Sequence, residues 1–247
     1  MDPTLIFGAI ITGLALGLTG GGGTLLALPI LHQGVGLDLS AATTASLAAV
    51  ALLSFVGTAW RWDSGIIKGR LALLFAGAGA IGAPIGAYLH TLTPTSILIG
   101  LFSTIVLFVS MRMWTDKSDP PLVTTPTNED TGPVCQFSID GKLRITSRCG
   151  FRLSLLGMGV GVLSGLVGVG GGFLTVPALL ALTGLPLRTA VATSLLVVGL
   201  ISSMGWVSHT LLGHSAPLQQ TSLFAGCGVI GLLLGTWMVQ RLPQTIL

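Results

Sequence analysis

The sequence predicts an all-α integral membrane protein built from two inverted structural repeats. In each repeat, a glycine-broken first element, re-entrant or hairpin-like, precedes the transmembrane helices. The prediction rests on composition, long uncharged apolar segments and an internal repeat. Charged residues make up 8% of the 247 residues and hydrophobic residues 51%. Soluble domains carry about 25% charged residues, so this composition excludes soluble enzymes and, despite a net charge of +3, nucleic-acid-binding proteins.

The apolar segments are long enough to cross a bilayer, which takes about 20 residues of α-helix. Five uninterrupted segments meet this length: residues 41–60, 71–90, 95–114, 189–208 and 218–240. Two further segments are apolar but interrupted by glycines. Residues 4–32 are broken by glycines 20–23, and residues 153–182 are broken around glycines 168–172.

An internal repeat relates the two interrupted segments. Adding 148 to a residue number in the first half gives its match in the second, for example Gly20 with Gly168, Pro29 with Pro177 and Ser46 with Ser194. After one inserted residue the offset becomes 149 and pairs Gly79, Gly82 and Gly86 with Gly228, Gly231 and Gly235. So many matches in one register indicate that the two halves are structural copies.

The repeat divides the chain into transmembrane repeat 1 (residues 1–114), a linker (115–149) and transmembrane repeat 2 (150–247). The copy of segment 95–114 would begin at Gln244, so we expect the final helix of repeat 2 to be missing or truncated. Within the linker, alternating residues 136–145 around Asp140-Gly141 predict a short β-hairpin. Three cysteines, an odd number without metal-type spacing, predict no disulfide framework, no metal site and no cofactor.

Basic residues predict the orientation, because Lys and Arg concentrate on the cytoplasmic side of membrane proteins. If each interrupted segment crosses once, Arg188 and Arg241 fall outside. If each enters and returns as a hairpin, all 11 basic residues fall inside. The hairpin topology gives each half an odd number of crossings and therefore inverts the repeats. We predict a multi-pass protein of the inner (plasma) membrane with a cytoplasmic central loop.

The glycine clusters predict a site for a small anion. Helix N-termini carry unpaired N–H groups and a partial positive charge, and glycines let an oxyanion approach the backbone closely. Pro29 and Pro177 are expected to support the broken helices. The predicted binding residues are Thr19, Gly20, Gly21, Gly22, Gly23, Thr24, Ser46, Gly168, Gly170, Gly171, Gly172, Thr193 and Ser194. The alternative is that the glycines only allow close helix packing, which we favour for Gly82 and Gly86.

The two glycine motifs also carry a family resemblance. Residues 17–29 read GLTGGGGTLLALP, residues 165–177 read GLVGVGGGFLTVP, and residues 192–195 read ATSL. These motifs resemble the signature of the TauE/SafE family of membrane permeases. The resemblance implies a secondary transporter that exports sulfite or a short organosulfonate. The solute would bind between the two glycine-broken helices and cross by alternating access.

Two other functions remain open from the sequence. One is a passive anion channel on the same scaffold; the other is a non-transporting membrane subunit or sensor whose hairpin binds a cytoplasmic partner. No Ser/His/Asp set or buried acid pair supports an enzyme. The four histidines are expected at membrane edges, as surface or interfacial residues, with His32 the only candidate for a coupling proton. Neither a coupling ion nor a homo-oligomer is specified.

Overall fold

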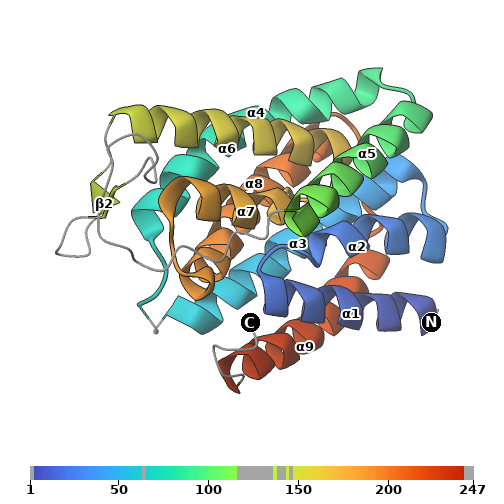
Figure 1. Cartoon of the computed structure of the whole chain (residues 1–247). Helices are drawn as coiled ribbons and strands as arrows, with labels where there is room; N and C mark the ends of the chain where they lie inside the picture. Colours follow the sequence, from blue (N-terminus) through green and yellow to red (C-terminus); the bar gives the residue numbers. More distant parts are fainter. Residues whose placement is uncertain (1–2, 63–64, 116–135, 138–142, 145–146, 242–247) are drawn as a thin grey trace.

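The structure is a computed structural model that describes residues 3–62, 65–115, 136–137, 143–144 and 147–241. Helices dominate it, and a single pair of short strands lies between the two halves of the chain (Figure 1). The first half contains α1 (Pro3–Thr19), α2 (Thr24–Pro29), the π-helical η1 (Ile30–Gly34), α3 (Leu39–Trp62), α4 (Gly69–Leu92) and α5 (Thr95–Thr115). The second half contains α6 (Ser147–Val167), α7 (Gly172–Thr183), α8 (Leu187–Leu211) and α9 (Leu218–Arg241).

Five described segments are long and apolar enough to cross a membrane. They are α3, α4, residues Cys149–Val167 of α6, α8, and residues Leu218–Val239 of α9. Four of the five predicted spans are thereby confirmed. The fifth, residues 95–114, is helical as α5, but its described apolar part, Thr95–Leu107, is shorter than a full span. α6 adds a span that the sequence had placed inside an interrupted segment.

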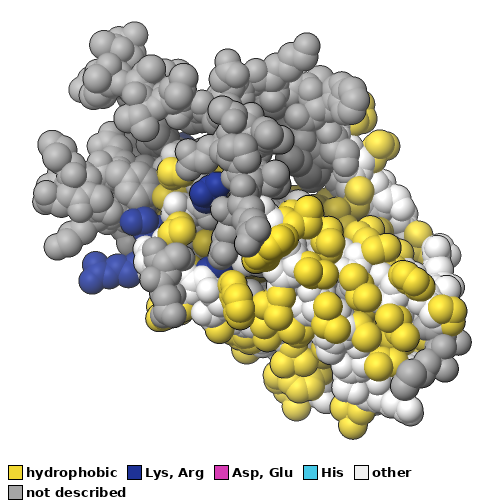
Figure 2. All heavy atoms as spheres, turned by 90° about the horizontal axis from the view of Figure 1, so that it is seen from below, with side chains coloured by type: hydrophobic (Ala, Val, Ile, Leu, Met, Phe, Trp, Pro, Cys, Tyr) yellow, Lys and Arg dark blue, Asp and Glu magenta, His cyan; other side chains and the backbone are white. Residues whose placement is uncertain are grey.

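The surface of the helices is strongly apolar, as a lipid environment requires. Large hydrophobic side chains are exposed along several helices, including Phe7, Leu73, Ile81, Phe151 and Leu155. Figure 2 shows hydrophobic side chains spread over one face, with Lys and Arg gathered at one side. Apolar surface on this scale marks contact with lipid or another apolar partner, so the structure is that of a membrane protein.

The centre of the fold is the pair of long helices α3 and α8, which are the most buried of the candidate spans. They run in opposite directions, since Leu47, near the start of α3, lies against Gly205, near the end of α8. In the same way Gly57 lies against Leu195. Pairs α1–α9 and α4–α6 pack beside this centre (Figure 1).

The flanking pairs are held together by glycines that bring backbones into contact. On α4, a Cβ added to Gly82 would collide with the carbonyl of Met158 on α6. On α9, a Cβ added to Gly231 would collide with the carbonyl of Ile10 on α1. Small residues at such positions allow the close helix approach common in membranes, so the packing role expected for Gly82 and Gly86 is confirmed.

Two features belong to the linker and its border. Strands β1 (Gln136–Phe137) and β2 (Leu143–Arg144) pair antiparallel, with Gln136 opposite Arg144. The predicted turn at Asp140-Gly141, the linker from 116 to 135, and residues 242–247 lie outside the described residues. Cys149, at the start of α6, is disulfide-bonded. The expectation of a chain without disulfides is therefore wrong at this residue, because an odd cysteine count still leaves room for one bridge.

Gly82→Ala is expected to destabilise the protein, because the new methyl group meets the backbone of α6 and cannot be relieved by a side-chain rotation. Overpacking of this kind costs about 1–3 kcal/mol. Gly77→Ala on the same helix is the control, since a Cβ there meets nothing within 4 Å. Thermal unfolding of the purified proteins in detergent measures the effect. Equal melting temperatures for the two variants would contradict the packing role.

Candidate functional site

The first glycine cluster ends α1 at Thr19 and lets the chain turn back as α2. Gly20 has a φ of +72°, a conformation that favours glycine. The Thr19 hydroxyl oxygen accepts hydrogen bonds from the N–H groups of Gly22 at 2.7 Å and Gly21 at 3.4 Å. At the far end of the returning segment, the Thr4 hydroxyl donates to the carbonyl of Gly34 at 3.2 Å. The chain therefore comes back beside the start of α1.

The second cluster ends α6 at Val167 and begins α7 at Gly172. Gly168, Gly170 and Gly171 have φ values of +78°, +72° and +63°. A side chain at any of these positions would be strained, so this turn depends on glycine. The Thr175 hydroxyl donates to the carbonyl of Gly171 at 2.9 Å and closes the first turn of α7.

The two clusters touch each other inside the protein. A Cβ on Gly21 would collide with the carbonyl of Gly172, and one on Gly172 would lie 2.9 Å from the methyl group of Thr24. Gly20, Gly21 and Gly23 are buried, as are residues 168–172; Gly22 is half-buried and Thr19 is exposed. The contact region is therefore closed except on the side of Thr19 and Gly22.

Two serines bind the turns across the repeats. The Ser194 hydroxyl, on α8, lies 3.0 Å from the carbonyl of Gly20 and 2.8 Å from that of Val191. Ser46, on α3, makes the matching contacts to the carbonyls of Gly168 and Thr43. Ser46 and Ser194 are repeat mates, and so are Gly20 and Gly168. Each turn is thus held by a serine from the opposite half of the chain.

Three other predicted residues have different surroundings. Thr193, also on α8, accepts a hydrogen bond from the backbone N–H of Lys68 at 3.2 Å, so its hydroxyl serves the α3–α4 loop rather than a glycine turn. Pro29 ends α2, and the π-helical turn η1 follows it directly. Pro177 lies inside α7. A proline lacks an N–H donor, so both interrupt the regular hydrogen bonding of the returning segments.

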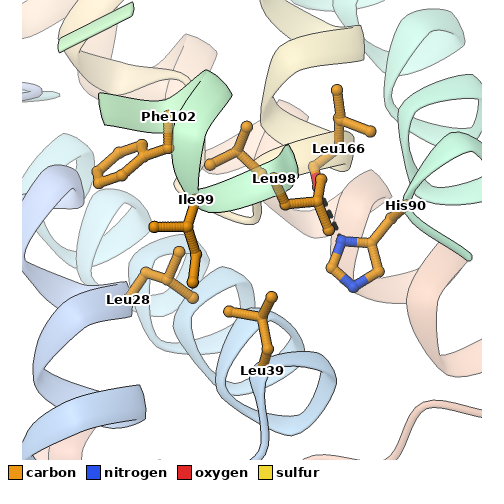
Figure 3. A pocket seen from close by; sticks show the side chains of 8 residues that line it. Leu28, Leu39, His90, Leu98, Ile99, Phe102 and Leu166 are labelled. Atoms are coloured by element: carbon orange, nitrogen blue, oxygen red, sulfur yellow. Dashed lines mark hydrogen bonds between the residues drawn. The ribbon is translucent and has the colours of Figure 1, made fainter. Parts of the chain in front are cut away.

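A cavity of about 30 Å³ lies between α2, α3, α4, α5 and α6 (Figure 3). Its lining is Leu28, Leu39, His90, Leu98, Ile99, Phe102, Leu166 and Val167. The space holds about one water molecule and is lined almost entirely by apolar side chains. It is too small and too apolar to hold an oxyanion, so it is not the solute site.

His90, seen in Figure 3, belongs to a buried histidine cluster that the sequence did not reveal. Its ring lies 4.9 Å from that of His209 and 6.0 Å from that of His214, measured between ring centroids. His209 is fully buried and His90 is 5% exposed. The expectation of surface or interfacial histidines is therefore wrong for these two, because helix ends that face water in isolation are covered here by the neighbouring helices.

The repeat gives one member of this cluster, His209, a counterpart in the first half. With the offset of 148, His209 falls on Arg61, and the carbonyls they bind, Gly165 and Gly17, are also mates. The Arg61 guanidinium donates to the carbonyl of Gly17 at 2.7 Å, and His209 Nε2 lies 2.7 Å from the carbonyl of Gly165. Arg61 lies buried in the last turn of α3.

Comparison with known proteins identifies the family. The sequence profile described as "Sulfite exporter TauE/SafE" matches residues 5–247. The chain belongs to this family of membrane transporters. A Xylella fastidiosa protein named "Probable membrane transporter protein" is 31% identical over 242 residues, covering 95% of this chain and 84% of the relative. A Bacillus subtilis protein named "Probable membrane transporter protein YdhB" is 22% identical over 247 residues. The match covers 98% of this chain and 92% of the relative. No solved structure matches the TauE/SafE chain.

Ser194→Ala is expected to lower the thermal stability by about 1–3 kcal/mol, because the buried carbonyl of Gly20 loses a donor from α8. Ser203→Ala on the same helix is the matched control, since Ser203 bonds only the carbonyl of Gly199 in its own helix, at 2.7 Å. Thermal unfolding in detergent should separate the two. A Ser194→Ala protein as stable as Ser203→Ala would show that the cross-repeat bond does not hold the first turn.

Proposed function

We propose that this TauE/SafE protein is a secondary transporter that exports a small anion, sulfite or a short organosulfonate, across the inner membrane. The observation that carries the proposal is the meeting of two glycine-broken turns inside the bundle. Broken helices at matching places of two halves are typical of transporter binding sites. Non-helical backbone at membrane depth persists only where protein buries it or where it lines a cavity.

The proposal includes an inverted repeat, and the exchange of contacts supports it. Leu47 of α3 packs on Gly205 of α8, and their mates Leu195 and Gly57 pack on each other. The flanking pairs follow the same rule. Helix α1 is the repeat mate of α6, and α4 is the repeat mate of α9. The pair α4–α6 therefore corresponds to the pair α9–α1. When two copies are related by a two-fold axis, a contact of residue i in the first copy with residue j in the second is matched by a contact of residue j in the first copy with residue i in the second. Since α3 and α8 run in opposite directions, the axis lies in the membrane plane.

The orientation follows from which ends lie together. The bond from Lys68 N–H to Thr193 places the α3–α4 loop beside the first turns of α8, where Arg188 lies. The bond from Thr4 to Gly34 returns the first segment to the side from which it entered. These contacts support the topology in which basic residues share one side, and we assign that side, with the central loop, to the cytoplasm.

We place the solute at the contact between the turns, on the side of Thr19 and Gly22. The Thr19 hydroxyl oxygen accepts from two glycine N–H groups, which is the position an oxyanion oxygen would take. Gly172 meets this region from the second turn, since a Cβ there would lie 2.9 Å from Thr24 and 3.0 Å from Gly21. Ser46 and Ser194 hold the turns in register. Because the donors are neutral amides and hydroxyls, binding stays weak enough for release, as transport requires.

The contact between the turns, closed except on the side of Thr19 and Gly22, corresponds to a carrier that is open to one side. Each flanking pair joins one helix from each half, α1 with α9 and α4 with α6. Rocking of these pairs about α3 and α8 would open the turns first to one side and then to the other. The glycine contacts let backbones slide past each other without side-chain collisions.

Solute counterflow in proteoliposomes tests the function. Vesicles preloaded with sulfite should take up labelled sulfite by saturable exchange, and sulfoacetate, taurine, sulfate and chloride serve as competitors that define the solute class. A channel would show flux without counterflow. Absence of exchange with every one of these solutes, in folded protein, would reject the proposed function.

Gly22→Val is expected to reduce counterflow by about tenfold or more, because the added side chain displaces the Thr19 hydroxyl and fills the open side of the site. The three atoms nearest to a Cβ at Gly22 all belong to the side chain of Thr19, so the fold should tolerate it. Gly34→Val is the control, at the exposed end of the same segment, where a Cβ has only Ile30 within 4 Å. Wild-type exchange by a folded Gly22→Val protein would remove this residue from the site.

A further inference from the structure

Three of the four histidines of the chain gather beside the second glycine turn. His90 comes from α4, His209 from the end of α8, and His214 from the loop that follows. The ring centroids of His209 and His214 are 5.6 Å apart, and both rings lie within 6.0 Å of His90. The backbone N–H of His214 donates to the carbonyl of His209 at 3.0 Å, so the loop holds the rings together.

Hydrogen bonds decide which nitrogens carry protons. His90 Nδ1 lies 2.8 Å from the carbonyl of Leu166, and His209 Nε2 lies 2.7 Å from that of Gly165. A carbonyl only accepts, so both of these nitrogens carry hydrogen. In the neutral rings, His90 Nε2 and His209 Nδ1 are therefore basic lone pairs.

Two of the remaining ring nitrogens lack partners. Within the described part of the chain, His209 Nδ1 and His214 Nε2 are buried without a hydrogen-bond partner. Buried polar atoms of this kind call for an explanation. One added proton would supply a hydrogen for neighbouring imidazoles to share. No group of three His, Cys, Asp or Glu side chains among the described residues is placed to hold a metal ion.

The surroundings can stabilise one positive charge. The carbonyls of Gly165 and Leu166 belong to the last turn of α6, where the helix dipole favours a cation. Asp38, just before α3, favours a positive charge on His90, whereas burial of the ring opposes it. α5 contributes apolar Leu98 to the same surroundings. Half-buried His214 connects the cluster to the end of the molecule opposite Lys68 and Arg188.

We propose that His90, His209 and His214 form the proton-binding site that couples proton movement to solute transport, an inference that rests on the proposed function. The cluster takes up one proton from water near His214, forms a new N–H bond within the cluster, and releases the proton to water on the other side during the transport cycle. The bonded carbonyls lie two and three residues before Gly168, whose carbonyl binds Ser46. Charge in the cluster therefore acts on the second turn.

Substitutions that preserve each hydrogen bond but do not titrate test this site in the full-length protein. Gln replaces His209 because its amide nitrogen reproduces Nε2, and Asn replaces His90 because its amide reproduces Nδ1. His32→Asn is the matched control: His32 Nδ1 lies 2.8 Å from the carbonyl of Leu37, at the end of η1 and outside the cluster. Proteoliposomes with a pH dye inside measure proton movement with sulfoacetate as the probe, because it does not titrate near neutral pH.

The wild type and His32→Asn should accumulate sulfoacetate against its gradient when a pH gradient is imposed, with matching proton flux. In His209→Gln and His90→Asn, this accumulation should be at least about tenfold lower than in the wild type. The counterflow rate of both variants should stay within about threefold of the wild-type rate. Gradient-driven accumulation by His209→Gln at the wild-type level would overturn the proposal, and so would a wild type whose exchange moves no protons. A wild type without counterflow for any solute would instead reject the proposed function.

¹⁵N-histidine NMR of the same vesicles gives a readout independent of transport. In the wild type, the resonances of His90 and His209 should change together with pH. In His209→Gln the coupled titration should disappear while the resonance of His32 keeps its behaviour. Independent titration of each histidine in the wild type would contradict a shared proton site.

Discussion

The constraint on which this structure depends is that backbone groups freed by a broken helix need partners inside the protein. Lipid offers none, and each unpaired group costs several kcal/mol. The two turns meet this demand in the same way. Ser194 binds the carbonyl of Gly20, and Ser46 binds that of Gly168. Because each serine comes from the opposite half, each turn gains part of its stability from the packing of the two repeats.

The same demand explains why glycine is concentrated on the flanking helices. Helices α3 and α8 pack against both turns, which leaves little room for the flanking helices. The two helices of each flanking pair, α1 with α9 and α4 with α6, must therefore lie close to each other. Glycines such as Gly82 and Gly231 make this possible, because each lies against a carbonyl of the neighbouring helix. In a membrane, such van der Waals contact replaces the hydrophobic effect as the force that holds helices together. The repeated glycines, by which the two halves can be recognised in the sequence, are therefore also the residues that let the flanking helices pack together.

The sequence predicts most of this architecture, because hydropathy and repeat matching report on features that are local or symmetric. The spans within α3, α4, α8 and α9, and the packing role of Gly82, follow directly. Side-chain direction does not: Thr193 and Ser194 are neighbours, yet only Ser194 faces a glycine turn. Burial at the ends of helices cannot be predicted in this way either, as the buried His90 and His209 show. Both depend on how α4, α6 and α8 pack, which no local pattern encodes.

The most informative departure from symmetry is the exchange of Arg61 for His209. At the end of α1 a guanidinium binds the carbonyl of Gly17, and at the end of α6 an imidazole binds the carbonyl of Gly165. An arginine keeps its charge at any physiological pH, whereas a histidine can gain and lose a proton there. A fully symmetric carrier would give both turns the same charge at every step. With a fixed cation beside one turn and a titratable group beside the other, the proton binding that we propose would act on one half alone. A carrier needs such an asymmetry if protons are to bias the direction in which its two halves rock.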